Sequence, residues 1–227
     1  MTRRILLLSS STVNHGGYLD YAEEEIGDFL GQIRKILFVP FALYDRANYL
    51  ERVKDRFNRM GYEVDLFAKG AAHKDAAVFI GGGNTFRLLK ALYDLDLLAT
   101  IRDLVAEGAP YMGSSAGSNV ACPTIRTTND MPIVQPPSFD ALGLVPFQIN
   151  PHYLDVGPGS THMGETREER IEQFLEENEM PVVGLREGAW LRVEAEESRL
   201  GGIAGARLFR RGRSPAELER GATIKMS

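Results

Sequence analysis

The sequence predicts an α/β fold with a mostly parallel central sheet and helices on both faces. Short apolar runs alternate with longer amphipathic segments through the first half of the chain. Strands and helices that alternate in this way form βαβ units, and such units build parallel sheets. The chain also contains no repeat, low-complexity tract or linker, so we expect one domain over residues 1–227.

The periodicity of apolar residues predicts each element of the first half. Short aliphatic runs predict strands at residues 5–8, 36–39, 64–67, 77–80 and 111–112. Helical spacing predicts helices at residues 46–60, 84–93 and 97–107, and a further helix that begins at Ala116. Gly61 and Gly108 follow two of these helices, which is typical of helix ends.

The second half is less regular. Residues 122–145 are rich in proline and show little periodicity, and a loop of this length in a compact domain is usually functional. Beyond it we expect a helix at residues 166–177 and partly antiparallel strands at residues 182–185, 190–193 and 207–209. We expect turns such as Gly201-Gly202 to join these strands. Residues 155–163 are a candidate lid.

The composition narrows the classes of function. A net charge of −5, without a basic run, argues against nucleic acid as the main partner. The single cysteine, Cys122, suits a reducing compartment and excludes a zinc site built from cysteines. No stretch approaches the roughly 20 apolar residues of a membrane helix, and the first apolar run is too short for a secretion signal. We therefore expect a cytoplasmic protein without membrane contact.

Gly113-Ser114-Ser115-Ala116-Gly117 fits the pattern G-x-S-x-G. It lies between a predicted strand and a predicted helix, which is the context of a nucleophile elbow. Ser115 is then the candidate nucleophile, although glycine and serine also form ordinary turns. Ser114 places a second hydroxyl beside it.

The run Gly81-Gly82-Gly83 also follows a predicted strand and precedes a helix. Backbone N–H groups of Gly82 or Gly83, together with that of Ala116, could form an oxyanion hole. A phosphate cradle is a weaker interpretation, because no lysine stands where a P-loop needs one. A tight turn without any ligand is the third interpretation.

A nucleophilic serine needs a base, and the chain contains four histidines. His73 lies in a polar stretch and His162 in a loop rich in glycine, serine and threonine, whereas His15 could line a pocket. His152 follows a short apolar run and so lies at a predicted strand end, where sites of α/β proteins gather. Its position makes it the best candidate.

Two carboxylates could orient such a base, namely Asp130 in the long loop and Glu187 after a predicted strand. Their spacing along the chain does not choose between them.

Several segments together resemble the peptidase E family, the α-aspartyl dipeptidases. They are residues 81–86, 113–117, 122–134, 139–142, 148–152 and 164–167, of which 122–134 is the most specific. The resemblance implies a class I glutamine amidotransferase-like fold and hydrolysis of Asp-X dipeptides without metal or cofactor. It also implies Ser115 as nucleophile and His152 as base. Both Asp130 and Glu187 match acidic residues of the family; we favour Glu187 as the partner of the histidine.

Selection of an aspartyl side chain requires a cation. Arg167 is our first candidate, because a guanidinium binds a carboxylate through two parallel hydrogen bonds. An ordinary surface ion pair with Glu165 or Glu169 is the alternative role for this arginine.

Arg126 is the second candidate for the selecting cation, and Asn84 is a further candidate for substrate contact. Asp130 would bind the α-ammonium group of the substrate or support the site loop. Two other functions stay open: hydrolysis of β-aspartyl or cyanophycin-type peptides by the same fold, and a non-catalytic module that only binds a ligand. A homodimer is possible.

Overall fold

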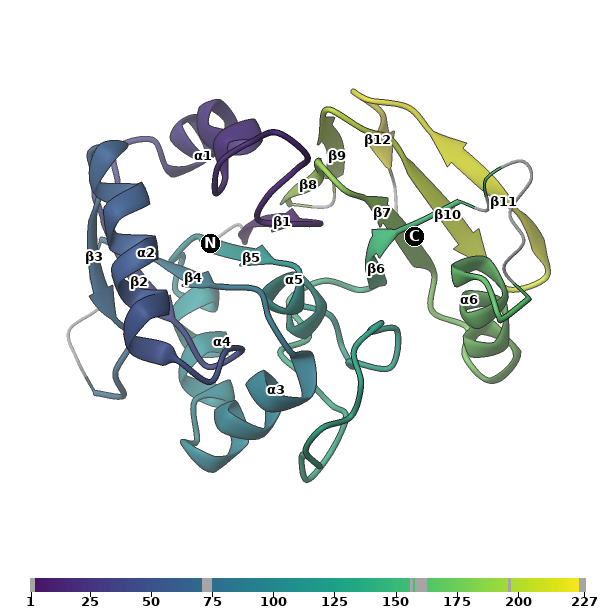
Figure 1. The fold of residues 1–227 in the computed structure, drawn as a ribbon, viewed down its shortest axis with the longest axis horizontal. Helices are drawn as coiled ribbons and strands as arrows, with labels where there is room; N and C mark the ends of the chain where they lie inside the picture. The colour runs from purple at the N-terminus through teal and green to yellow at the C-terminus, as the bar shows by residue number, and fades with distance from the viewer. Residues whose placement is uncertain (1–2, 71–74, 156, 158–162, 196, 225–227) are drawn as a thin grey trace.

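A computed structural model describes residues 3–70, 75–155, 157, 163–195 and 197–224. In this part of the chain the strands form two sheets (Figure 1). The larger sheet contains, from edge to edge, β12 (Thr223–Ile224), β9 (Glu197–Gly202), β8 (Ala189–Glu194), β1 (Arg4–Leu8), β5 (Tyr111–Ser114), β4 (Ala76–Ile80), β2 (Lys35–Val39) and β3 (Glu63–Leu66). The smaller sheet contains β11 (Arg213–Leu218), β10 (Ala206–Arg210), β7 (Val182–Arg186) and β6 (Gln148–Tyr153).

The centre of the larger sheet is parallel, as predicted. Strands β1, β5, β4, β2 and β3 pair in parallel, and β8, β9 and β12 extend the sheet in antiparallel fashion. The carboxyl ends of β1 and β5 lie side by side, with Leu8 opposite Ser114. The smaller sheet was not anticipated as a separate layer; within it β6 and β7 are parallel and the other pairs antiparallel.

Helices cover both faces of the larger sheet, which confirms the predicted fold class. One face packs against α1 (Glu23–Leu30) and α2 (Arg46–Arg59), and a short 3₁₀ turn, η1 (Asp20–Ala22), precedes α1. The other face packs against α3 (Thr85–Asp94), α4 (Leu98–Ala106) and α5 (Ala116–Val120).

The sequence pattern missed α1. Only its Ile26, Phe29 and Leu30 are buried, so its apolar stripe is too short to stand out, and its formation depends on packing against the sheet.

The smaller sheet lies at the opposite end of the molecule from α2 and α4 (Figure 1). One of its faces contributes Val183, Leu185 and Leu208 to the main core, and the other packs against α6 (Arg167–Glu177). Helix α6 begins with a capping box, in which Thr166 and Glu169 each bind the backbone N–H of the other.

One predicted turn was wrong. Gly201 and Gly202 are not a connection between strands but the last two residues of β9. A Cβ on Gly201 would lie 2.2 Å from the Trp190 ring, so this glycine makes room for the indole on the neighbouring strand. Strands β11 and β12 escaped prediction because most of their side chains are exposed and give no apolar alternation.

The long loop between α5 and β6 connects the two sheets. Its only extended pairing in the described residues is a single bridge between Thr124 and Asp140. Backbone hydrogen bonds such as that from the Ile125 N–H to the Phe139 carbonyl hold the loop together. Side chains attach it to β6: Thr127 Oγ1 donates to the Ile149 carbonyl at 2.8 Å, and Asn129 Nδ2 donates to the Pro151 carbonyl at 2.7 Å. The loop is therefore ordered against β6, next to His152.

Two of the four histidines, His73 and His162, lie outside the described residues, as does most of the candidate lid at 155–163. Among the described helices, none combines the length and apolar character needed to cross a membrane.

Candidate active site

Ser115 lies where β5 ends and α5 begins, as the G-x-S-x-G pattern predicts. Its backbone is strained, with φ 52° and ψ −108°. The turn requires glycine nearby, because a Cβ on Gly117 would lie 2.0 Å from the Ile80 carbonyl oxygen. The backbone N–H of Ser115 donates to the Leu8 carbonyl at 2.9 Å, which attaches the elbow to β1. This packing projects the side chain of Ser115 from the carboxyl edge of the sheet.

His152 connects the serine to a carboxylate. Its Nε2 lies 2.9 Å from Ser115 Oγ, and its Nδ1 lies 2.7 Å from Glu187 Oε1. Both contacts are within hydrogen-bond range, so the three side chains form a continuous chain. Glu187 follows the last residue of β7, and His152 lies at an irregularity of β6 with φ 54°. Ser115 at the end of a strand of the larger sheet thus meets His152 and Glu187 from two strands of the smaller sheet.

Ser9 holds the histidine in place, and the sequence analysis missed it. The backbone N–H of His152 donates to Ser9 Oγ at 2.9 Å, and Ser9 Oγ donates to the Leu185 carbonyl at 2.7 Å. The next residue, Ser10, accepts from the Gly188 N–H at 3.3 Å. The signal in the sequence was a run of serines directly after the first strand, at the edge where α/β sites form.

The glycine run lies beside the elbow. A Cβ on Gly82 would come within 3.1 Å of Ser115 Cβ, so the two backbones approach as closely as glycine allows. Among the described residues, no acceptor takes the N–H of Gly83 or of Ala116. Ala116 is the first residue of α5, and the first N–H groups of a helix have no partner within it. Both groups are therefore available to an oxyanion.

Asp130 does not contact His152. Its Oδ2 accepts from the backbone N–H of Thr85 at 2.7 Å and from Thr85 Oγ1 at 2.6 Å, at the N-terminus of α3. The other oxygen has no hydrogen-bond partner among the described residues. Of the two candidate acids, only Glu187 contacts the histidine. Asp130 attaches the long loop to α3 through one carboxylate oxygen, and its other oxygen stays available to a ligand.

Arg167 is the first residue of α6 and lies within electrostatic range of Asp130. Burial, which is the largest cause, and the neighbouring Arg170 lower the pKa of its guanidinium, and Asp130 opposes this shift. The surface ion pair considered above does not form: Glu165 binds Arg170 at 3.6 Å, and Glu169 belongs to the capping box. Within the described residues Arg167 has no ion-pair partner, so it is available to an acidic ligand.

The other two candidates for substrate contact have different surroundings. Asn84 Oδ1 accepts from the Arg87 N–H at 3.0 Å, and Asn84 Nδ2 donates to the Met131 carbonyl at 2.9 Å. Both polar ends of this amide are engaged, which favours a structural role for Asn84 over the predicted substrate contact. Arg126 is exposed, and its guanidinium lies 5.2 Å from the centre of the Phe139 ring.

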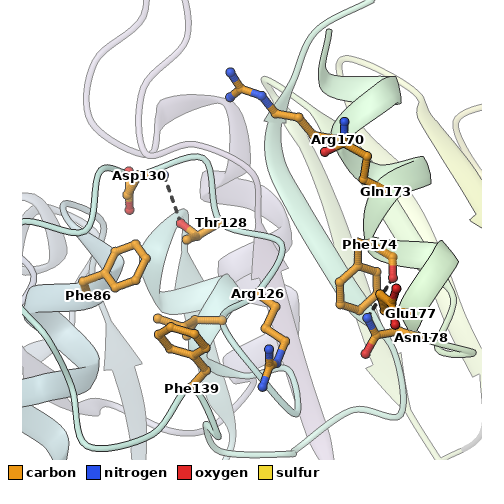
Figure 2. Close-up of a pocket in the computed structure, with 11 residues that line it drawn as sticks. Phe86, Arg126, Thr128, Asp130, Phe139, Arg170, Gln173, Phe174, Glu177 and Asn178 are labelled. Carbon is orange, nitrogen blue, oxygen red and sulfur yellow. Dashed lines mark hydrogen bonds between the residues drawn. The ribbon is translucent and has the colours of Figure 1, made fainter. Parts of the chain in front are cut away.

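A groove of about 440 Å³ runs between the long loop and α6 (Figure 2). Asp130 and Thr128 lie on the loop side, and Phe174 and Glu177 project from α6 on the opposite side. Arg126 lies beside Phe139 on the loop side (Figure 2). No group of three or more His, Cys, Asp or Glu side chains within the described ranges is arranged to hold a metal ion.

The chain is similar to one protein family and to several named relatives over nearly its whole length. The sequence model of Peptidase family S51 matches residues 5–201. Peptidase E of Streptomyces coelicolor is 55% identical over 225 residues, which cover 97% of this chain and 93% of the relative. The Drosophila melanogaster protein named "Probable alpha-aspartyl dipeptidase" is 49% identical over 216 residues, covering 92% and 90%.

A solved structure shows the same fold at low sequence identity. The peptidase from an acI-B1 Actinobacterium superposes with a TM-score of 0.72 at 18% identity, covering 99% of this chain and 97% of the other. The fold, the matched residues and the identity to these relatives all lead to one assignment: the chain belongs to Peptidase family S51.

Proposed function

We propose that this protein is a serine dipeptidase that cleaves the peptide bond after an N-terminal aspartate through an acyl-enzyme. The observation that carries the proposal is the hydrogen-bonded chain from Ser115 Oγ through His152 to Glu187, at 2.9 and 2.7 Å. A nucleophile, a base and an orienting acid in contact are the arrangement that acyl transfer by serine requires. The names of the two relatives, peptidase E and alpha-aspartyl dipeptidase, support the same activity.

In the proposed mechanism, His152 Nε2 takes the proton of Ser115 as its oxygen attacks the carbonyl carbon. The N–H groups of Ala116 and Gly83, which have no acceptor among the described residues, bind the oxyanion that develops. Loss of one such donor typically raises the barrier by about 3 kcal/mol. Glu187 stabilises the imidazolium. His152 then donates the proton to the leaving amine, and water releases aspartate from the serine.

Substrate selection in this proposal depends on charge. The substrate has an α-ammonium group and a short side-chain carboxylate. One carboxylate oxygen of Asp130 and the guanidinium of Arg167 have no partner in the described chain. Asp130 therefore complements the α-ammonium group of an N-terminal aspartate, and Arg167 complements its side-chain carboxylate. Asn-X dipeptides should be poor substrates, because they offer one acceptor oxygen and no charge.

The test compares kcat/KM for Asp-Leu, Asn-Leu and β-Asp-Leu in the parent protein and in Arg167→Met. We expect the parent to cleave Asp-Leu best, and Arg167→Met to lose Asp-Leu hydrolysis by a factor of about 10² or more. Arg126→Met is the matched control and should keep the Asp-to-Asn ratio of the parent. An unchanged ratio in Arg167→Met, with a changed one in Arg126→Met, would move the role to Arg126.

The same measurements separate this proposal from the two alternatives. Preference for β-Asp-Leu would indicate a β-aspartyl or cyanophycin-type hydrolase. Failure of an active-site serine reagent to label Ser115, with no cleavage of any dipeptide, would indicate a module that only binds a ligand. The homodimer and the single domain stay predictions, which light scattering and limited proteolysis can test.

A further inference from the structure

Three functional residues have sequence neighbours that meet in one ionic cluster. His152 precedes Tyr153, Glu187 follows Arg186, and Arg167 precedes Glu168. These three neighbours join Arg207 and Glu217 of the smaller sheet and Asp155, which follows β6. We call this set, Tyr153, Asp155, Glu168, Arg186, Arg207 and Glu217, the ionic cluster.

Arg186 is the first of its two hubs. Its Nε donates to Asp155 Oδ2 at 2.6 Å and its Nη2 to Asp155 Oδ1 at 3.0 Å, which is a bidentate pair. Its Nη1 and Nη2 bind the two carboxylate oxygens of Glu217, at 2.5 and 3.0 Å. The Arg186 side chain is 22% exposed, so four charge-assisted bonds fix it in a largely buried place. The end of β7, from which Glu187 projects, is thereby tied to the segment that follows β6 and to β11.

Arg207 on β10 is the second hub. Its Nη1 donates to Glu168 Oε2, and lies 3.3 Å from the hydroxyl of Tyr153 and 3.9 Å from Asp155 Oδ1. Tyr153 is buried in β6, while Glu168 belongs to the first turn of α6. Arg207 thus ties the first turn of α6, where Arg167 lies, to the strand that carries His152.

The alternation of side chains along a strand explains how such a cluster can act on the site. Val183 and Leu185 of β7 face the main core, whereas Val182 faces α6. Arg186 therefore points to the α6 face, and Tyr153 does the same after the irregularity of β6. When ion pairs hold one side chain on the α6 face of a strand, they also hold the backbone at that residue. The backbone in turn fixes the position of the adjacent residue, whose side chain points toward the site.

We propose that Arg186 and Arg207 are positioning residues, which act through their clamped neighbours: Arg186 sets the place of Glu187, and Arg207 sets the place of Arg167 relative to His152. The inference rests on the proposed function, since it concerns the acid and the selector of that reaction. It assigns different tasks to the two hubs, and this difference makes it testable.

The experiment measures kcat and KM for Asp-Leu and Asn-Leu in Arg186→Met and Arg207→Met. Arg186→Met should lower kcat about tenfold with little change in the Asp-to-Asn ratio. Arg207→Met should raise KM for Asp-Leu about tenfold and reduce that ratio, with kcat largely kept. Arg207→Lys should recover part of the loss, since an ammonium can still bind Glu168.

Arg192→Met is the matched control. Arg192 is also a strand arginine that binds three carboxylates, Glu25, Asp28 and Glu194, but it lies on β8 away from the site. Its loss should lower Tm as much as the cluster variants do, without changing kcat, KM or the substrate ratio. If the cluster variants change the kinetics no more than Arg192→Met does, the cluster is only structural and the inference is wrong.

Double variants give the decisive readout. Arg186→Met should add nothing to Glu187→Gln, and Arg207→Met should add nothing to Arg167→Met, because each pair acts as one unit. Multiplicative losses would overturn the proposal. Where Arg186→Met does not fold, Glu217→Gln removes one branch and should give a smaller loss of the same kind. Failure of the parent protein to cleave Asp-Leu would instead overturn the proposed function.

Discussion

Ser115 is held by backbone packing in the larger sheet, whereas His152 and Glu187 are held by side-chain contacts in the smaller one. Around the serine, glycines at 82, 113 and 117 allow backbones to touch, and each added Cβ would meet its neighbours at close range. Around the histidine and glutamate, serine hydroxyls and arginine clamps provide the restraint. The backbone packing around the serine follows from a local sequence motif. The side-chain contacts around the histidine and the glutamate form only after the two sheets have assembled.

The largest effect should come from removing the nucleophile. Ser115→Ala should lower kcat for Asp-Leu by roughly 10⁴-fold or more, because no acyl-enzyme can form. Ser114→Ala is the control: the Ser114 hydroxyl is buried and has no hydrogen-bond partner in the described part of the chain, so this variant should keep most of the activity. Steady-state kinetics on both variants measures this. Full activity in a folded Ser115→Ala protein would exclude the serine mechanism.

Replacement of the two acids, Glu187 and Asp130, should distinguish the catalytic role of the first from the substrate-binding role of the second. Glu187→Gln should lower kcat by roughly 10²-fold through loss of imidazolium stabilisation. Asp130→Asn retains an oxygen that can accept from Thr85, so it should chiefly raise KM, by about tenfold, through loss of the ammonium contact. A collapse of kcat in Asp130→Asn, with KM unchanged, would reverse the two assignments.

Gly117→Ala tests how far backbone packing supports the elbow. The new Cβ would lie 2.0 Å from the Ile80 carbonyl, so we expect a loss of about 3 kcal/mol in the free energy of unfolding and at least tenfold in activity. For a chain of this size the loss corresponds to a fall in Tm of about 10 °C. Gly27→Ala in α1 is the control, since its Cβ would meet nothing closer than 4.0 Å and alanine favours a helix. Equal Tm values for the two variants would show that the elbow tolerates a side chain.

Ser9→Ala should have the smallest effect of the four and tests the other kind of support. The variant removes the acceptor of the His152 N–H and the donor to the Leu185 carbonyl, so we expect a loss of about 1–3 kcal/mol in stability and a several-fold lower kcat. Ser10→Ala loses only one long contact, at 3.3 Å, and should change kcat less. An unchanged kcat in Ser9→Ala would mean that the strand alone positions the histidine.

The sequence by itself determined the α/β class and the parallel order of elements in the first half, and it indicated Ser115 as the candidate nucleophile. Each of these depends on neighbours along the chain. The strands are short apolar runs, and glycines at positions 113 and 117 flank Ser115. The resemblance to peptidase E added His152 and Glu187 as candidate partners of this serine. Local patterns sufficed there because the forces that shape an elbow act over a few residues.

The spacing of residues left open which acid meets the histidine, and the tertiary structure shows that Glu187 makes the contact. The tertiary structure alone decided which arginine lacks an ion-pair partner among the described residues and which side chains hold the acid and the histidine in place. Glu187 and Asp130 lie 35 and 22 residues from His152, so spacing could not choose between them. Ser9 is 143 residues from the histidine that it supports, and Arg207 is 39 residues from Glu168. A single side chain carries no signal of a partner so distant, because the contact arises from the packing of two sheets rather than from a local conformational preference.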